Sequence, residues 1–487
     1  MMPSLDRGLL RNRAYIGGEW VDAADGSSFA VTDPADASVV ATVADLSRAD
    51  AERAIVAAHA AFPAWRTTSA KERSRLLRRW FDLVMSRADE LAAILSREQG
   101  KPFSEARDEI IYGASFIEWF AEEARRVYGD VVSAPKPGRE MVVLKEPVGV
   151  TAAITPWNFP NAMITRKIAP ALAVGCTAIV KPAAETPLSA LALAVLADEA
   201  GIPPGVLNVL TTSRTSAIGD LLTSDPRVRK ISFTGSTEIG RLIMRQCSDT
   251  IKKASLELGG NAPFIVFDDA DLDQAVSGAI ASKYRNSGQT CVCANRFYVQ
   301  AGVYGTFAEK LALAVSKLKV GSGFEADVQQ GPLISERALR KVQMLVDDAL
   351  RKGARIVIGG QPHARGGLFY EPTVLVDVPL TARLLHEEIF GPVAALVGFE
   401  HESEVVDYVN DSEFGLASYV YTQDLGRAWR LARSLDVGIV GINESAVSTT
   451  EAPFGGVKQS GIGREGSRYG IDSYLEIKYV CMGGLAR

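Results

Sequence analysis

Short apolar segments alternate with helix-like segments after residue 148, and this alternation constrains the fold more than any other feature of the chain. The strand-like segments lie in GVTAAITPWNFP, CTAIVKPAAETPLSALALAVLADEAG, GVLNVLTT and VRKISFTGSTEIGRLIMRQC, and several of them lead directly into a helical pattern. Strands that alternate with helices build parallel sheets with helices on both faces, and such sheets bind ligands at the carboxyl ends of their strands. The sequence therefore predicts a doubly wound α/β fold.

The chain has 487 residues, which is long enough for more than one hydrophobic core. We predict a Rossmann-like dinucleotide-binding domain from residues 1–124 and 148–258, with helices in its first part. The pattern changes at KKASLELGGNAPFIVF, and we predict a second α/β domain over residues 259–453. The strand-like segments MVVLKEPVG and SYLEIKYVCMGG lie outside both series. Residues 125–147 and 470–487 are therefore predicted to form a small β-strand arm that docks on a partner subunit.

The bulk properties exclude several classes of protein. A net charge of −5 argues against a nucleic-acid binder. The longest apolar run, residues 168–180, is too short for a membrane span, and the N-terminus lacks the apolar core of a secretory signal. We therefore expect a cytoplasmic protein without nucleic-acid or membrane partners. The five cysteines are odd in number and the four histidines lack metal-ligand spacing, so we predict neither a disulfide framework nor a metal site.

Two loops that follow predicted strands carry groups suited to a phosphate. GSTEIG, from Gly235 to Gly240, opens a helix whose N-terminal N–H groups favour an anion, although it matches neither GxGxxG nor a P-loop. KPAAET places Lys181 at the carboxyl edge of the sheet. Taken singly, the first reads better as a tight turn and the second as a solvated charge. Together they favour a dinucleotide site.

Three further residues stand in contexts that suit catalysis. Glu257 lies in the apolar and glycine-rich LELGGN, where burial raises a carboxyl pKa toward the range of a general base. Asn158 lies between two bulky aromatic residues in TPWNFP and offers an amide donor. Cys291 lies in the turn-rich NSGQTCVCAN, where it is accessible as a nucleophile. A paired buried Glu, a loop-holding Asn and a small buried Cys are the structural alternatives, and burial is favoured for the cysteines at 176, 247 and 481.

Taken together, the motifs resemble those of the aldehyde dehydrogenase superfamily. TPWNFP, the KPA loop, FTGSTEIG, LELGGN, GQTC, EEIFGP and PFGGVKQSG occur in family order along nearly the whole chain. SKYRNSGQTCVCANRFYVQ, WNFPNAMITRK and GREGSRYGIDSYLEIKY further resemble the succinate-semialdehyde dehydrogenase branch. A non-catalytic protein that kept only the fold is disfavoured, because nucleophile, base and oxyanion donor are all present.

The resemblance implies a catalytic role for five residues. Cys291 would attack the aldehyde carbon, and the Asn158 amide with the Cys291 backbone N–H would stabilise the oxyanion. Glu257 would activate the water that hydrolyses the thioester. Lys167 together with Glu476 would help to move the proton away. The product would be a carboxylic acid.

The resemblance also implies cofactor contacts for one set of residues. Lys181 would bind the adenosine ribose or its phosphate, Ser236 the pyrophosphate and Glu388 the nicotinamide ribose. The full set is Thr155, Pro156, Trp157, Lys181, Ala184, Gly235, Ser236, Leu258, Glu388 and Phe390. Many NAD-preferring relatives carry Glu at the position of Ala184, so we predict NADP, while the neighbouring Glu185 keeps NAD open.

A substrate that carries a carboxylate at its far end needs a cation in the pocket. Arg166 and Arg285 match positions that bind this carboxylate in the succinate-semialdehyde branch, and Ser448 would assist. The alternative is that both arginines form internal salt bridges. We predict succinate semialdehyde as substrate, with glutarate semialdehyde and a broad aldehyde specificity as alternatives, because one methylene discriminates by only about 1 to 3 kcal/mol.

Two further expectations follow from the resemblance. Cys293 would pair with Cys291 as a redox switch, provided that the loop bends, since residues i and i+2 of an extended strand are roughly 6.5 Å apart. The alternative is a small packing residue. The predicted arm resembles those that build dimers and tetramers in this family, so we expect a homo-oligomer.

Overall fold

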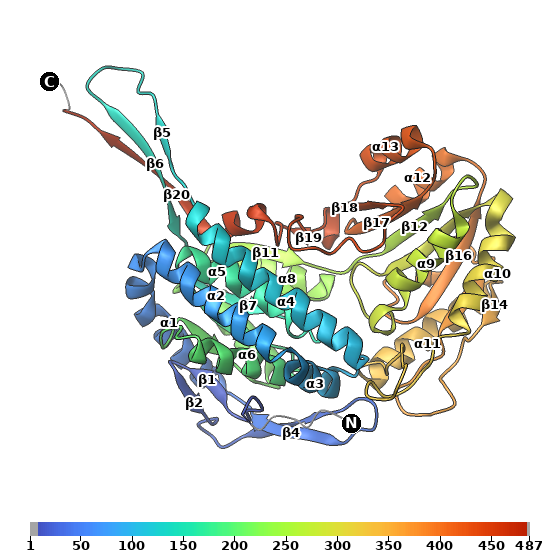
Figure 1. Cartoon of the computed structure of the whole chain (residues 1–487), viewed down its shortest axis with the longest axis horizontal. Coiled ribbons are helices and arrows are strands. Elements are labelled where there is room, and N and C mark those ends of the chain that lie inside the picture. The colour runs from blue at the N-terminus through green and yellow to red at the C-terminus, as the bar shows by residue number, and fades with distance from the viewer. Residues whose placement is uncertain (1–7, 485–487) are drawn as a thin grey trace.

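Two large sheets and a projecting arm make up the chain in the computed structural model, which describes residues 8–484 (Figure 1). Residues 1–7 of the predicted first domain and 485–487 of the predicted arm lie outside the described residues. The α/β class predicted from the sequence is confirmed, because parallel strands alternate with helices in both sheets.

The first sheet has eight strands in the order β19-β11-β10-β7-β8-β9-β1-β2. Its five central strands, β11 to β9 in that order, are parallel, while β19 and β1 add antiparallel edges. These edge strands come from distant parts of the chain. The bounds are β1 Ala14–Ile16, β2 Glu19–Val21, β7 Val150–Ile154, β8 Thr177–Lys181, β9 Leu207–Val209, β10 Val228–Thr234, β11 Lys253–Glu257 and β19 Gly461–Ile462.

Helices cover this sheet, and the predicted helical stretch before residue 125 forms four of them. Their bounds are α1 Arg48–Thr67, α2 Ala70–Ser86, α3 Ala88–Gln99, α4 Phe103–Glu123, α5 Ala162–Val174, α6 Leu188–Glu199, α7 Thr215–Ser224 and α8 Thr237–Ser248. The apolar run from 168 to 180 is the second half of α5 and most of β8, and all of it is buried. Gly175, with φ 100°, ends α5 in the left-handed conformation that glycine adopts most easily.

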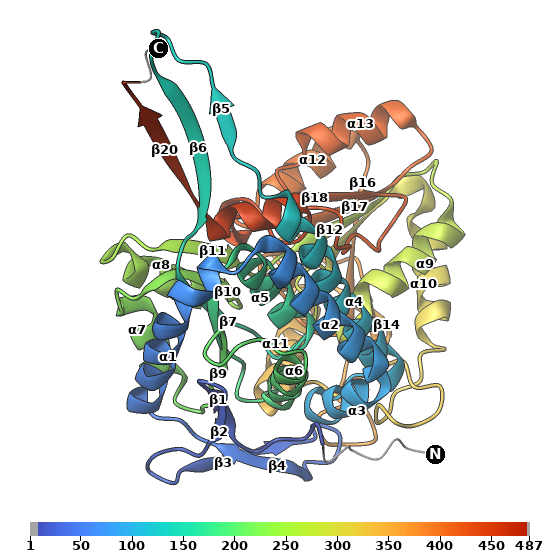
Figure 2. The same cartoon turned by 60° about the vertical axis from the view of Figure 1, so that its left-hand side comes forward.

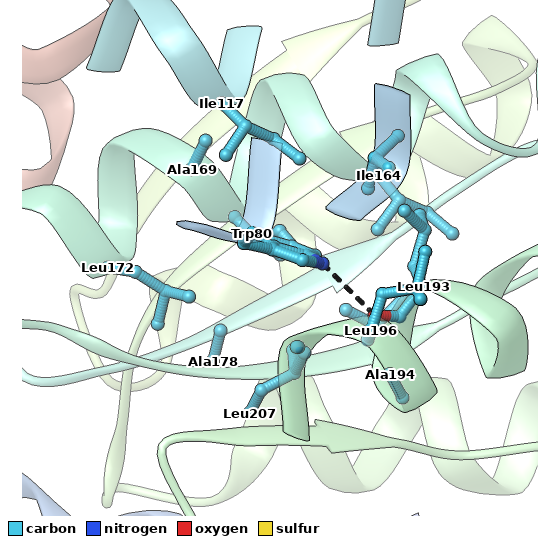
Figure 3. Packing of buried hydrophobic residues seen from close by; sticks show 14 of the residues in the cluster. Trp80, Ile117, Ile164, Ala169, Leu172, Ala178, Leu193, Ala194, Leu196 and Leu207 are labelled. Atoms are coloured by element: carbon cyan, nitrogen blue, oxygen red, sulfur yellow. Dashed lines mark hydrogen bonds between the residues drawn. The ribbon is translucent and has the colours of Figure 1, made fainter. Parts of the chain in front are cut away.

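Trp80 lies at the centre of the core that these helices share with the sheet (Figure 3). Its indole packs among Ile117 of α4, Leu172 of α5 and Leu196 of α6, and its Nε1 donates to the carbonyl of Leu193 at 3.2 Å. A buried Trp is well tolerated when its N–H finds a partner. This packing fixes α4 and α5, the two helices that carry residues of the site.

The second sheet has seven strands in the order β14-β15-β16-β13-β12-β17-β18, parallel except for β14. Its strands are β12 Ala262–Val266, β13 Ala294–Gln300, β14 Arg355–Ile358, β15 Thr373–Val376, β16 Val393–Phe399, β17 Ala417–Tyr421 and β18 Ile439–Ile442. Its helices are α9 Leu272–Lys283, α10 Tyr304–Val315, α11 Glu336–Arg351, α12 Glu402–Asn410 and α13 Leu425–Ser434. The chain passes from the first sheet to the second between β11 and β12.

A three-stranded antiparallel sheet projects from the body, as Figures 1 and 2 show. It is made of β5 Asp130–Val132, β6 Glu140–Pro147 and β20 Leu475–Met482. Residues 470–474 were predicted to belong to the arm, but they lie in a 3-10 helix, Arg468–Tyr474, whose Ile471 and Tyr474 are buried in the body. A smaller sheet pairs β3 Ser28–Thr32 with β4 Val39–Ala44.

Further 3-10 turns join the main elements, at Ala124–Arg126, Arg285–Gly288, Ala301–Val303, Arg383–Leu385 and Lys458–Ser460. Among residues 8–484, no helix has the length and apolar character needed to cross a membrane.

Candidate active site

A cleft of about 350 Å³ opens between the two sheets, at the carboxyl ends of strands in the first. The loops that follow β7, β10 and β11 form one wall, and α11 with residues 388–390 forms part of the other. This is where ligands bind in open α/β sheets. The lining residues are Pro156, Trp157, Asn158, Glu185, Thr234, Gly235, Ser236, Leu258, Gly259, Cys291, Ile334, Ser335, Arg337, Ala338, Lys341, Glu388, Ile389 and Phe390.

Cys291 lies in this cleft, half-buried, on a turn that leads into β13. The turn is closed by a hydrogen bond from the Cys293 N–H to the Thr290 carbonyl at 3.0 Å. A side chain at Gly260 would come within 2.6 Å of the Cys291 carbonyl, so the close approach of these two loops requires glycine there. Burial raises the pKa of the Cys291 thiol to about 12, with Glu388 adding to the shift. The thiol is therefore neutral at physiological pH and needs a base.

Asn158 is buried beside the thiol loop, as an oxyanion donor would have to be. Its Nδ2 donates to the carbonyl of Gln289 at 3.0 Å, and within residues 8–484 the second N–H of the amide has no acceptor. The backbone N–H of Cys291 also has no acceptor in the described part of the chain. Two donors thus remain for an oxygen that develops negative charge at this position.

Glu257 ends β11 and is buried, with its Oε2 lacking a hydrogen-bond partner. Burial raises the pKa of this carboxyl well above its usual range, and the negative charge of Glu465 raises it further. A carboxyl of this kind can take a proton near neutral pH, as a general base must. The sequence indicated this environment correctly.

Lys167 and Glu476 were expected to work together, and the structure contradicts this pairing. Glu476 is exposed on β20 at the base of the arm, where it pairs with Lys253 at 3.0 Å. The partner of Lys167 is Glu465, whose Oε1 accepts a hydrogen bond from the Lys167 Nζ. The residue was missed because its motif, GREGSRYG, was read as a family marker only. No local pattern marked it, because Glu465 follows the charged Arg464, whereas Glu257 lies between two leucines.

Glu465 also forms an ion pair with Arg166, at 2.8 Å between Oε2 and Nε. Arg166, Lys167, Glu257 and Glu465 are all buried, and we call them the buried charged cluster. Arg166 contacts the ring of Phe454 at 4.0 Å, and its Nη2 has no hydrogen-bond partner. Of the two roles weighed for Arg166, the internal salt bridge is therefore present, while one nitrogen is left for a ligand.

Arg285 differs from Arg166 in its exposure and in its lack of an ion pair. It is exposed, it lies over the ring of Phe159 at 5.0 Å, and no carboxylate within residues 8–484 pairs with it. Its positive charge still lowers the pKa of Cys291.

Ser448 is half-buried in the loop before residue 450, and no hydrogen bond of its hydroxyl is found in the described residues. Its predicted role stays a prediction.

The predicted cofactor residues gather in the same cleft. Ser236 caps α8, its Oγ accepting from the Ile239 N–H at 3.4 Å, so that the helix N-terminus faces the cleft behind Gly235. Trp157 and Phe390 meet edge to face at 5.5 Å. Of the predicted set, Pro156, Trp157, Gly235, Ser236, Leu258, Glu388 and Phe390 line the cleft.

The loop of Glu388 and the loops that follow β7 and β8 carry the other predicted cofactor residues. Glu388 accepts from the Gly260 N–H at 3.1 Å, and burial raises its pKa to about 7. Thr155 and Lys181 are buried at the strand ends next to the cleft, and burial lowers the pKa of Lys181 to about 8. Ala184 is half-buried, whereas Glu185 is exposed and lines the cleft. A helix N-terminus and a carboxylate in the cleft, with a buried cation next to it, fit the phosphates and ribose hydroxyls of a dinucleotide.

Besides Glu465, sequence reasoning assigned no role to three charged residues that line the cleft. Arg337 and Lys341 lie on α11, and Glu185 lies in the KPAAET loop, where it had been considered only as a neighbour of Ala184. No motif marked α11, because its position opposite the first sheet depends on how the two sheets pack. Within residues 8–484, no cluster of His, Cys, Asp and Glu is suited to hold a metal ion.

Cys293 is buried, with its Sγ directed at the carbonyl of Lys283 at 3.4 Å. The loop does bend, as a disulfide with Cys291 would require, but both cysteines are free. The redox switch stays a prediction.

Comparisons with known proteins agree with this geometry. Residues 20–480 match the model of the aldehyde dehydrogenase family. The chain is 58% identical to a 3-sulfolactaldehyde dehydrogenase of Pseudomonas putida, covering 100% of both chains. It is also 58% identical to a glutarate-semialdehyde dehydrogenase of Pseudomonas aeruginosa, covering 99% of each. For the NADP(+) succinate-semialdehyde dehydrogenase GabD of Escherichia coli the identity is 58%, covering 98% of this chain and 99% of the relative.

A solved structure shows the same architecture. The succinate-semialdehyde dehydrogenase from Burkholderia pseudomallei superposes with a TM-score of 0.98 at 58% identity, covering 99% of this chain and 100% of that one. The resemblance seen in the motifs is therefore confirmed over the full length. The chain belongs to the aldehyde dehydrogenase family, within the branch that holds the succinate-semialdehyde dehydrogenases.

Proposed function

We propose that the enzyme oxidises a short aldehyde that carries an anionic group at its far end, with succinate semialdehyde as the first candidate and NADP as the preferred cofactor. The observation that carries this proposal is Arg285, an exposed guanidinium that has no carboxylate partner in the described residues yet lies close enough to influence Cys291. A guanidinium in this position can bind a carboxylate or sulfonate through two parallel hydrogen bonds.

The residues of the site support one sequence of steps. Water in the open cleft takes the proton of the Cys291 thiol, the thiolate attacks the aldehyde carbon, and the Asn158 amide with the Cys291 N–H holds the resulting oxyanion. The nicotinamide, when bound, supplies the hydride acceptor that turns the thiohemiacetal into a thioester. Glu257 then takes a proton from the water that attacks the thioester. Lys167 and Glu465 adjoin Glu257 and provide the route by which this proton leaves the buried charged cluster.

Three anionic aldehydes are candidates for the substrate, because the relatives are named for succinate semialdehyde, glutarate semialdehyde and 3-sulfolactaldehyde. We would measure kcat/KM from nicotinamide reduction with succinate semialdehyde, glutarate semialdehyde, 3-sulfolactaldehyde and butanal. At least one anionic aldehyde should exceed butanal by about 100-fold, and Arg285→Met should close most of that gap. Which aldehyde is fastest decides the chain length and the head group.

The matched control is Arg229→Met, which removes an exposed cation at the opposite edge of the sheet, at the start of β10. It should leave the ratio of kcat/KM between the anionic aldehyde and butanal unchanged. Equal turnover of butanal and the anionic aldehydes by the unmodified enzyme would show a broad aldehyde dehydrogenase, and the head-group proposal would then be wrong.

The preference for NADP is proposed from Ala184 and Lys181. Ala184 leaves space where a longer carboxylate would repel a 2′-phosphate, and Lys181, with its pKa of about 8, is mostly protonated at neutral pH. Affinity for NADP relative to NAD should therefore fall as the pH rises above 8. Ala184→Glu should lower kcat/KM for NADP by about 10-fold or more while sparing NAD. A preference for NAD in the unmodified enzyme would overturn this proposal.

We also propose that the arm pairs with a second copy of the chain. The sheet exposes Val131, Ile477 and Tyr479, at 79%, 74% and 55% of their surface, which is unusual for apolar side chains of a lone protein. Sedimentation of Ile477→Asp beside the unmodified enzyme tests this. The substitution should lower the assembly state from a dimer or tetramer, whereas a monomeric unmodified enzyme would contradict the proposal.

A further inference from the structure

A buried ion pair lies behind the oxyanion loop and is not part of the chemistry described above. Lys101, just before α4, and Glu109, within α4, meet at 2.6 Å, and each side chain is 1% exposed. Buried ion pairs contribute little net stability, since the cost of removing two charges from water is about as large as their attraction. The reason for this pair must be sought in its other contacts.

Both partners hold the backbone of the oxyanion loop. The Lys101 Nζ donates to the carbonyl of Asn158 at 2.8 Å, and it also lies 3.9 Å from the centre of the Phe159 ring. The second oxygen of Glu109 accepts from the N–H groups of Asn161 at 2.9 Å and Ala162 at 3.3 Å. The pair therefore binds both ends of the segment from 158 to 162, which leads into α5.

A second set of contacts links this segment to the loop before the thiol. The Nδ2 of Asn286 donates to the carbonyls of Asn158 at 3.0 Å and Gln289 at 3.2 Å. Asn286 has φ 52°, a left-handed conformation, and its own N–H is held by Glu105 of α4 at 2.7 Å. With the bond from the Asn158 amide to Gln289, the two loops are tied together on both sides, and α4 holds them both.

We propose that Lys101 and Glu109 are positioning residues that fix the Asn158 peptide so that the free amide N–H meets the oxyanion. An oxyanion donor works only within a narrow distance from the developing charge, and small displacements are costly. The carbonyl of Asn158 is held by Lys101 and Asn286, and its amide is held by Gln289. With these three contacts in place, the second N–H has a fixed direction before the substrate arrives. This inference rests on the oxyanion role proposed for Asn158.

The test is a double-mutant cycle on kcat with the fastest aldehyde. Lys101→Met/Glu109→Met replaces the pair by apolar side chains of similar length, which cores often accept without loss of stability. The double variant should lower kcat by about 10- to 100-fold, part of the effect of losing an oxyanion donor. In the N158A background the same change should lower kcat by less than about 3-fold, because the donor that the pair positions is already gone.

The control is Arg73→Met, which removes a buried cation of α2 from the far end of α5, where Arg73 Nε donates to the carbonyl of Ala173 at 2.9 Å. It should leave kcat unchanged, and cofactor affinity, measured by fluorescence, should be unchanged in all variants. If the double variant does not fold, Lys101→Arg, which keeps the cation but moves its donors, carries the same cycle.

Each result decides between the proposals. Equal losses of kcat in both backgrounds, or no loss with Asn158 present, would overturn the positioning role while leaving the oxyanion role intact. Full activity of Asn158→Ala alone would instead show that the oxyanion role itself is wrong.

Discussion

The two arginines near Cys291 were given one role from the sequence, but the structure places them in opposite environments. Arg166 belongs to the buried charged cluster, where Glu465 compensates its charge at 2.8 Å. Arg285 is exposed against Phe159 and has no carboxylate partner in the described residues. A buried charge is costly unless it is paired, whereas an exposed charge stays hydrated until a ligand binds. For these two arginines, burial rather than residue type separates the charge that is paired inside the protein from the charge that stays unpaired at the surface.

The largest expected effect comes from removing the charge of Glu465. Glu465→Gln leaves Arg166 and Lys167 buried without a counter-ion, which should lower the free energy of unfolding by about 3 to 5 kcal/mol. Denaturant unfolding measures this loss. Glu476→Gln, which breaks an exposed pair with Lys253, is the matched control and should cost less than about 1 kcal/mol. Similar losses in the two variants would show that the cluster does not depend on charge balance.

The next effect concerns Glu257, the proposed general base, which belongs to the same buried charged cluster. Glu257→Gln should lower steady-state turnover by about 100-fold, while the first burst of nicotinamide reduction remains, because hydrolysis of the thioester needs the base and hydride transfer does not. Since the pKa of Glu257 is raised, the unmodified enzyme should gain turnover as the pH rises through that pKa and the carboxyl loses its proton. The variant should lack this rise. A burst lost together with turnover would place Glu257 in an earlier step.

A smaller effect is expected on the alkylation rate of the Cys291 thiol, which lies near both arginines. With a pKa of about 12, Cys291 exposes little thiolate, so inactivation by iodoacetamide in the absence of cofactor should speed up about tenfold for each pH unit between neutral and pH ~9. Residual aldehyde oxidation measures this rate, so that alkylation of the exposed Cys481 does not interfere. A rate that levels off near neutral pH would mean that Arg285 and Arg166 outweigh burial at the sulfur.

The smallest effect should be the stability change at Arg285. Arg285→Met removes only an exposed contact with Phe159 and should change the free energy of unfolding by less than about 1 kcal/mol. Arg166→Met, measured beside it, should cost several times more, since it leaves Glu465 with one partner fewer. Equal losses of unfolding free energy in the two variants would show that Arg166 and Arg285 do not differ in their contribution to stability.

Much of the site could be predicted because its residues lie in motifs that are local in sequence. Glu257, Asn158 and Cys291 each stand in a short segment whose glycines or aromatic residues indicate an unusual environment, and the structure places all three near one another. Glu465 and the α11 residues Arg337 and Lys341 lack such a segment. They reach the site only because β19 returns to the first sheet and α11 packs across the cleft.

The sequence by itself determined the α/β class, and it led to the predictions of a domain boundary at β11 and of Cys291 as the nucleophile, because periodicity and strand-end motifs are local properties of the chain. Only the tertiary structure decided which carboxylate meets Lys167, which arginine stays free, and which buried pair holds the loop of Asn158. The contacts of Lys167 and Lys101 join residues 298 and 57 positions apart, and the exposure of Arg285 depends on whether another element covers its side chain. Burial and pairing of charges arise when the sheets and helices pack, so no pattern within one segment specifies them.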